Sequence, residues 1–101
     1  MTITSKLSDD SRELTIKISG RFDFSSLQTF RDAYEKVDGS PQAYVVDLAD
    51  AEYLDSSALG MLLALRDHAG GDQANIRITN AIPDVKKILI ITKLDELFSV
   101  E

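Results

Sequence analysis

The sequence contains no cysteine, which excludes disulfide bonds, thiolate catalysis and zinc sites built on cysteine. This absence is also typical of proteins from a reducing compartment. Long apolar runs are missing too, because the two strongest, residues 58–65 and 88–91, are far too short to span a bilayer. No basic segment followed by an apolar stretch begins the chain, so no secretory signal is expected. These absences predict a cytoplasmic protein without direct membrane insertion.

Positive charge is also scarce, since 11 Lys and Arg residues face 17 Asp and Glu residues and the net charge is −6. No basic block interrupts this acidic composition, so nucleic acid and anionic lipid are not expected as partners. A hydrophobic fraction of 44% is typical of a globular protein, and 101 residues suffice for one domain over residues 1–101. A protein partner is therefore expected.

Motifs of catalysis and cofactor binding are absent. The chain has no Ser-His-Asp order, no G-x-S-x-G elbow and no glycine-rich phosphate loop, so neither enzymatic activity nor a cofactor is expected. Asp47, Asp50 and Asp55 lie close together and could hold a metal, but no regular ligand loop joins them and a solubilising role is the simpler interpretation. His68 is the sole histidine and is expected to be a solvated surface residue.

The first forty residues predict a hairpin followed by a helix. Residues Thr2–Leu7 and 14–20 alternate between apolar and polar, and turn-forming residues lie between them. Ser25 and Gln28 match a capping box, and apolar residues then recur at helical spacing until the expected stop at residues 39–41.

The remaining residues predict strands that alternate with helices. The expected elements are a central strand over residues 43–48 covered on both faces, a loop over 49–54, a helix over 56–69 ended by Gly70-Gly71, a buried strand over 75–79, a helix from Pro83 and a short terminal edge strand near 98–100. This order predicts a mixed sheet with helices on one face and right-handed crossovers between its parallel strands.

The helix over residues 56–69 begins with a carboxylate and two hydroxyls. Its first N–H groups lack intrahelical partners, so a phosphate is favoured there by hydrogen bonding and charge, and a serine in this turn can serve as a covalent switch. The simpler interpretation is that Asp55 or Ser56 is an N-cap worth about 1 kcal/mol.

The helical wheel predicts which residues of this helix face away from the core. At about 100° per residue, Ser57, Met61 and Ala64 share one direction, while the opposite, apolar side carries Leu59, Leu62, Leu63 and Arg66. Two interpretations of Met61 remain open: it packs against a neighbouring helix, or it forms an adaptable contact for a partner.

Three segments together resemble the STAS domain family, in particular stand-alone bacterial anti-sigma factor antagonists. Residues 55–60, Asp-Ser-Ser-Ala-Leu-Gly, resemble the family's Asp-Ser-Ser-Gly-Leu-Gly signature, and residues 18–23 and 82–89 resemble its strand ending in Gly-x-apolar-Asp and the opening of its third helix. The resemblance implies an α/β fold, with a mixed four- to five-stranded sheet and helices on one face.

The resemblance also implies phosphorylation-gated partner switching. In such families the unmodified antagonist binds a serine kinase that is also an anti-sigma factor, the kinase phosphorylates the antagonist, and a PP2C-like phosphatase restores it. The phosphoacceptor falls on Ser57, and the implied partner-binding residues are Asp23, Asp55, Ser56, Ser57, Met61 and Ala64. Ala58 departs from the signature by a methyl group beside the acceptor, which favours helix and could alter kinase access. The alternative function is a constitutive STAS accessory subunit of a membrane transporter complex.

Overall fold

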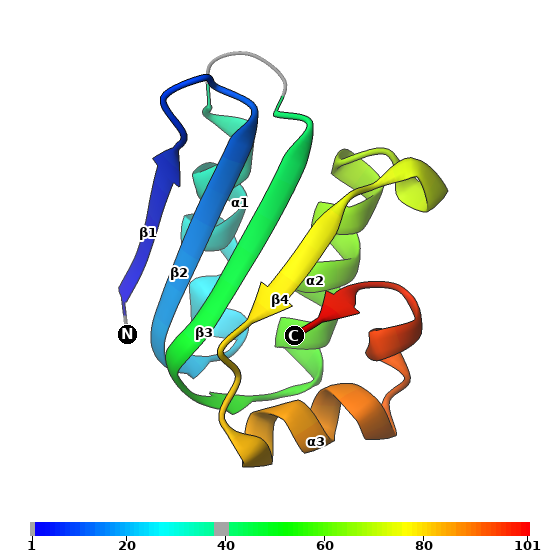
Figure 1. Ribbon diagram of the computed structural model, residues 1–101. Coiled ribbons are helices and arrows are strands. Elements are labelled where there is room, and N and C mark those ends of the chain that lie inside the picture. The colour runs from blue at the N-terminus through cyan, green and yellow to red at the C-terminus, as the bar shows by residue number, and fades with distance from the viewer. Residues whose placement is uncertain (1, 38–40) are drawn as a thin grey trace.

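The computed structural model describes residues 2–37 and 41–101, which form a five-stranded sheet with helices packed against it (Figure 1). The strands are β1 (Thr2–Leu7), β2 (Glu13–Phe22), β3 (Ala43–Leu54), β4 (Ile76–Thr79) and β5 (Ser99–Val100), in the spatial order of their numbers. β1 and β2 are antiparallel, and all other neighbours are parallel. The predicted hairpin and mixed sheet are confirmed, with β3 at the centre. Residues 39 and 40 of the predicted helix stop lie outside the described residues.

Helices α1 (Leu27–Glu35) and α2 (Ser56–His68) cover one face of the sheet, and α3 (Pro83–Ile91) lies at the end where β3 and β4 finish (Figure 1). Three short 3₁₀ turns, η1 (Phe24–Ser26), η2 (Gly71–Gln73) and η3 (Leu94–Glu96), complete the described elements. Gly70, which follows α2, has a φ of 120°, a conformation that favours glycine. No helix within residues 2–37 and 41–101 is long and apolar enough to cross a membrane.

The core lies between the sheet and the two covering helices. Alternate residues of β2, namely Leu14, Ile16 and Ile18, are at most 1% exposed and face these helices. Phe22 at the end of β2 contacts Phe30 of α1 with ring centroids 5.1 Å apart, which joins the sheet to the helix layer.

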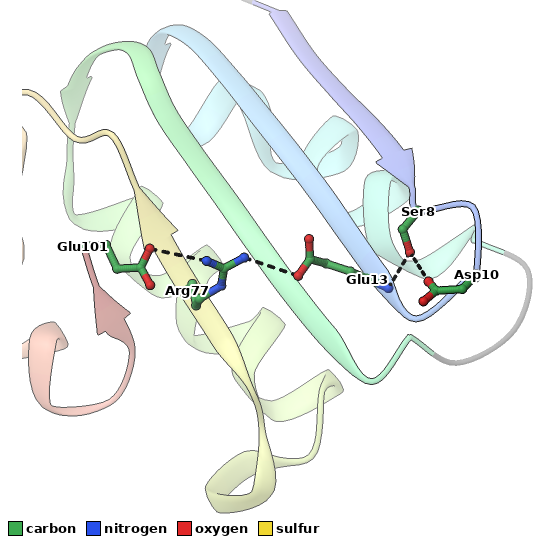
Figure 2. A network of polar contacts seen from close by, with 5 residues as sticks. All are labelled: Ser8, Asp10, Glu13, Arg77 and Glu101. Atoms are coloured by element: carbon green, nitrogen blue, oxygen red, sulfur yellow. Dashed lines mark hydrogen bonds and ion pairs between the residues drawn. The ribbon is translucent and has the colours of Figure 1, made fainter.

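No helix that the structure describes covers the opposite face of the sheet, which is mostly polar, so the expectation that β3 is covered on both faces is confirmed there only at Val45, which is 7% exposed. Figure 2 shows Arg77 of β4 between Glu13 of β2 and Glu101, at 3.3 and 3.4 Å. At the other end of this network the Glu13 amide donates to Ser8 Oγ, which donates to Asp10 and closes the β1–β2 turn (Figure 2). The central strand is therefore apolar toward the helices and bordered by ion pairs on the other side.

Two local predictions are corrected by the structure, the first of them by strand pairing that is distant in sequence. Residues 49–54 were expected to form a loop, but β3 continues to Leu54 because it pairs with β2 as far as Phe22. The capping box at Ser25 and Gln28 is also wrong. Ser25 belongs to η1, and the N-cap of α1 is Ser26, whose buried hydroxyl has no hydrogen-bond partner among the described residues.

Candidate functional site

The start of α2 is positioned by the sheet. Because Leu54 pairs with Phe22, Asp55 follows β3 directly, and its amide donates to the Phe22 carbonyl oxygen at 3.4 Å. Asp55 has extended backbone geometry, and its Oδ1 accepts from the Ala58 amide at 2.9 Å. The capping interpretation is therefore confirmed for Asp55. This arrangement also places the segment after Phe22 beside the first turn of α2.

A groove of about 320 Å³ runs between α1 and α2 at this end of the sheet. Ser57, Met61 and Ala64 line it from α2, as the shared direction predicts, together with Gly60. The facing side is formed by residues that the sequence analysis did not identify, Phe24, Leu27 and Arg31. Phe24 is 69% exposed, the largest exposed fraction among the large hydrophobic side chains that the structure describes. An exposed aromatic beside a groove is a typical anchor of a protein interface.

The orientation of α2 differs from the helical-wheel prediction by about a quarter turn. Its buried side consists of Ala58, Met61, Leu62 and Leu65. Met61 is only 4% exposed, so the packing interpretation is confirmed and the expected exposed stripe is wrong at this residue. Leu63, expected in the core, is 41% exposed. Arg66, placed at the centre of the apolar side, lies at its edge and pairs with Asp72 at 2.9 Å.

The two serines of the motif differ in their surroundings. Ser56 is exposed, whereas Ser57 is half-buried and contributes to the groove. Both belong to the first turn of α2, where backbone N–H groups point out of the helix end, and Asp55 accepts only the one from Ala58. The Ala58 methyl, expected beside the acceptor, is fully buried and points into the core. The groove is therefore not narrowed by this departure from the signature.

Asp23 lies in the connection next to Phe24, and its carboxylate is fixed by local hydrogen bonds. It accepts from both the amide and the hydroxyl of Ser25 and so caps η1, the ordinary turn role expected from composition. These hydrogen bonds, with a smaller contribution from Arg21 at 3.8 Å, lower the pKa of Asp23. The guanidinium of Arg21 also lies 4.4 Å from the centroid of the Tyr53 ring. Asp23 therefore carries a fixed negative charge next to Phe24, a residue that lines the groove.

The three aspartates considered for a metal have separate roles. Asp47 accepts from the Ala49 amide and from Asn80 Nδ2, Asp50 pairs with Lys17 at 3.3 Å, and Asp55 caps α2. No group of three or more His, Cys, Asp or Glu residues suited to a metal occurs in the described part of the chain. His68 is exposed, as expected, and its ring centroid lies 4.8 Å from that of Tyr34.

Comparisons with known proteins agree with this architecture. The family model described as "Mlab, STAS domain" matches residues 5–99. A STAS-domain containing protein of Pseudomonas aeruginosa (strain UCBPP-PA14) is 59% identical over 100 residues, which are 99% of each chain. A crystal structure of an anti-sigma factor antagonist from Mycobacterium paratuberculosis is 26% identical, covers 98% of this chain and 85% of its own, and has a TM-score of 0.76.

The fold also occurs in a protein of a different class. The crystal structure of a sulfate transporter family protein from Wolinella succinogenes has a TM-score of 0.70, with 10% identity over 83% of this chain and 73% of its own. At that identity the similarity concerns the fold alone. The family model and the Pseudomonas relative, by contrast, extend over nearly the whole sequence. This chain therefore belongs to the STAS domain family.

Proposed function

We propose that this chain is an anti-sigma factor antagonist that acts in the cytoplasm by phosphorylation-gated partner switching, as a binding module without catalytic activity of its own. The unmodified chain binds a serine kinase that is also an anti-sigma factor and releases what that protein sequesters. The observation that supports this proposal best is the position of Ser57, which lines an open groove beside the exposed Phe24. The similarity to the Mycobacterium antagonist supports the same class of partner.

The covalent step is a phosphoryl transfer to Ser57. The kinase transfers the γ-phosphoryl group of ATP to Ser57 Oγ, with release of ADP and of the hydroxyl proton. A PP2C-like phosphatase then hydrolyses the ester with water, which restores the hydroxyl and releases inorganic phosphate. Because the chain has no nucleotide-binding loop, both reactions depend on the partners.

Phosphorylation changes the charge of the groove more than its shape. The phosphate adds a charge of about −1.5 to −2 at the start of α2, where Asp55 is the N-cap and where the Asp55 amide contacts the carbonyl of Phe22, the residue before Asp23. An acidic or tightly packed partner surface is then repelled. The first turn of α2 offers backbone N–H groups to the phosphate, so the helix needs no rearrangement. Structures of the two forms are expected to superimpose, and a backbone rearrangement of the whole of α2 would contradict this mechanism.

Three variants test the proposal, with the serine kinase that the proposal assigns to this chain as the partner. Ser57→Ala is expected to retain binding and to lose phosphorylation. Ser57→Asp is expected to weaken binding by at least about 1–3 kcal/mol and to leave the melting temperature almost unchanged, since an acid suits a helix start. Ser56→Ala is the matched control for the phosphorylation site, because Ser56 is adjacent and exposed, and it is expected to leave the phosphorylation of Ser57 and the melting temperature unchanged.

The readouts are dissociation constants, melting curves and mass-spectrometric mapping of the phosphate after incubation with the kinase. Phosphate on Ser56 would contradict the assignment of the residue while leaving the switch in place. Equal affinities of the wild type, Ser57→Ala and Ser57→Asp would refute the switch itself. If Ser57 served only to stabilise the helix start, Ser57→Ala would destabilise the fold by about 1 kcal/mol and Ser57→Asp would not affect binding.

One observation supports a second function, that of a constitutive accessory subunit in a membrane transporter complex. The fold of this chain also occurs in the sulfate transporter family protein from Wolinella succinogenes. In that role the groove would bind its partner without modification of Ser57. Affinity purification from the native cell distinguishes the two functions. Recovery of transporter components without any kinase or anti-sigma protein would favour the accessory role.

A further inference from the structure

We infer that Arg31 forms an internal binding site for a phosphoryl group on Ser57, so that phosphorylation pairs the two helices across the groove. This inference rests on the proposed phosphorylation of Ser57. In addition to the charge repulsion described above, it gives the phosphate a specific binding partner within the chain. Arg31 lies on α1 and Ser57 on α2, and both line the same groove.

The guanidinium of Arg31 makes only loose contacts in the unmodified chain, with Glu35 and with the Tyr34 hydroxyl, whose pKa burial raises by more than Arg31 lowers it. Its Nε lies 3.9 Å from Glu35 Oε2, the upper limit of an ion pair, and the two side chains are 47% and 46% exposed. Exposed pairs between residues one helical turn apart contribute little, because solvent screens them and both side chains lose freedom. A phosphate carries more charge than the Glu35 carboxylate and accepts two parallel N–H bonds from a guanidinium. Exchange of Glu35 for the phosphate is therefore favoured.

Arg31 is the only cation among the groove-lining residues that the structure describes. The other arginine at this end of the molecule, Arg21, pairs with Asp23 at 3.8 Å and lies over the Tyr53 ring. Lys36, the C-cap of α1, pairs with Asp32 at 3.4 Å. The phosphate consequently meets one available guanidinium and two carboxylates, those of Asp23 and Asp55. Pairing with Arg31 is the arrangement that offsets the repulsion from these carboxylates.

This pairing has a consequence for partner binding. In the unmodified chain the half-exposed guanidinium stands at the groove and can bind a carboxylate of the partner. Once it binds the phosphate, the side chain extends across the groove between Leu27 and Met61. Phosphorylation then withdraws a cation from the interface and covers the apolar lining, in addition to introducing negative charge.

The test is a ³¹P NMR titration of the chain with phosphoserine at position 57, introduced during translation at that codon. The probe is the phosphoserine itself, and no partner is needed. The positive charge of Arg31 lowers the second pKa of the phosphate. The negative charges of Asp23 and Asp55 raise it, and Glu35 competes with the phosphate for Arg31. We expect this pKa to be about 0.5–1 unit lower in the otherwise unmodified chain than in Arg31→Gln. Arg31→Lys, which keeps the charge without the planar fork, is expected to lie between them.

Lys36→Gln is the matched control, because it removes the same charge from the end of the same helix but outside the groove, and it is expected to leave the pKa unchanged. Equal phosphoserine pKa values for the chain with Arg31 and for Arg31→Gln would overturn the inference. This outcome is distinguishable from failure of the proposed function. That failure would appear as an unchanged affinity for the kinase when position 57 carries phosphoserine, whatever the titration shows.

Discussion

Replacement of Phe24 by alanine separates partner binding from folding. The side chain is 69% exposed, yet it lines the groove that contains Ser57. Complete burial of a phenylalanine side chain contributes about 1.5–3 kcal/mol. Because only about a third of Phe24 is covered in the free chain, Phe24→Ala should lower the free energy of unfolding by no more than about 1 kcal/mol. The remaining two thirds of the side chain are available to a partner.

Burial of the exposed two thirds of the Phe24 side chain against a partner contributes about 1–2 kcal/mol to binding. The dissociation constant of Phe24→Ala should therefore be about 5–30-fold higher than that of the wild type. Calorimetric titration with the cognate kinase measures this change, and urea unfolding measures stability. Leu63→Ala is the control for exposure, because Leu63 is a 41% exposed residue of α2 outside the groove and should not affect affinity. Phe30→Ala is the control for burial, because Phe30 is 1% exposed and its loss should cost about 3–5 kcal/mol of stability.

Three results would refute this reasoning. An unchanged dissociation constant for Phe24→Ala would show that the groove is not the binding surface. A loss of stability comparable to that of Phe30→Ala would show that the exposed fraction of Phe24 does not describe its role in the folded chain. Equal losses of affinity for Phe24→Ala and Leu63→Ala would also contradict the choice of this groove over the rest of the α2 surface.

Three further predictions concern the frame of the site. Asp55→Ala should lower the free energy of unfolding by about 0.5–2 kcal/mol in urea melts and Asp55→Asn by much less, because only the first removes the acceptor of the Ala58 amide. Ala58→Gly should destabilise by about 1–2 kcal/mol through the lost buried methyl and helix propensity, with the phosphorylation rate unchanged; a faster rate would argue that the methyl obstructs the kinase. The pKa of Asp23 is lowered chiefly by the Ser25 hydroxyl, so the stabilisation is present above the unfolded pKa, near about 4, and is lost as the pH falls through the lower folded value. A carboxyl NMR titration should therefore show a higher Asp23 pKa in Ser25→Ala, and an unchanged pKa would contradict the assigned cause.

Local signals in the sequence were sufficient for the order of the elements. Asp55 as an N-cap, Gly70 after α2 and Pro83 at the first turn of α3 act on neighbouring backbone groups, and the structure confirms all three. The alternation of β2 likewise defines its buried face, because a strand has a period of two residues. These features depend on residues within a few positions of each other.

Features that depend on residues distant in the sequence could not be predicted from local signals. The end of β3 is fixed by pairing with Phe22, and nothing within residues 49–54 signals that pairing. The rotation of α2 was misjudged because Leu59 and Leu63 are apolar but are not part of its buried side. Phe24 and Arg31 were missed because their position beside Ser57 follows from the packing of η1 and α1 against α2. An apolar residue at a helix surface has no local mark that distinguishes core from interface.

The groove at Ser57 is defined by the sheet as much as by the helix that carries the serine. Asp55 is tied to Phe22 through its amide and to Ala58 through its carboxylate, and Ala58 is itself fully buried. The residues around the hydroxyl are thus fixed on one side by strand pairing and on the other by core packing. A phosphate on Ser57 then acts on side chains at the groove, such as the half-exposed Arg31, and not on the backbone beneath them. Such a switch changes the charge of the groove and the exposure of its apolar lining, and it has little effect on the stability of the fold.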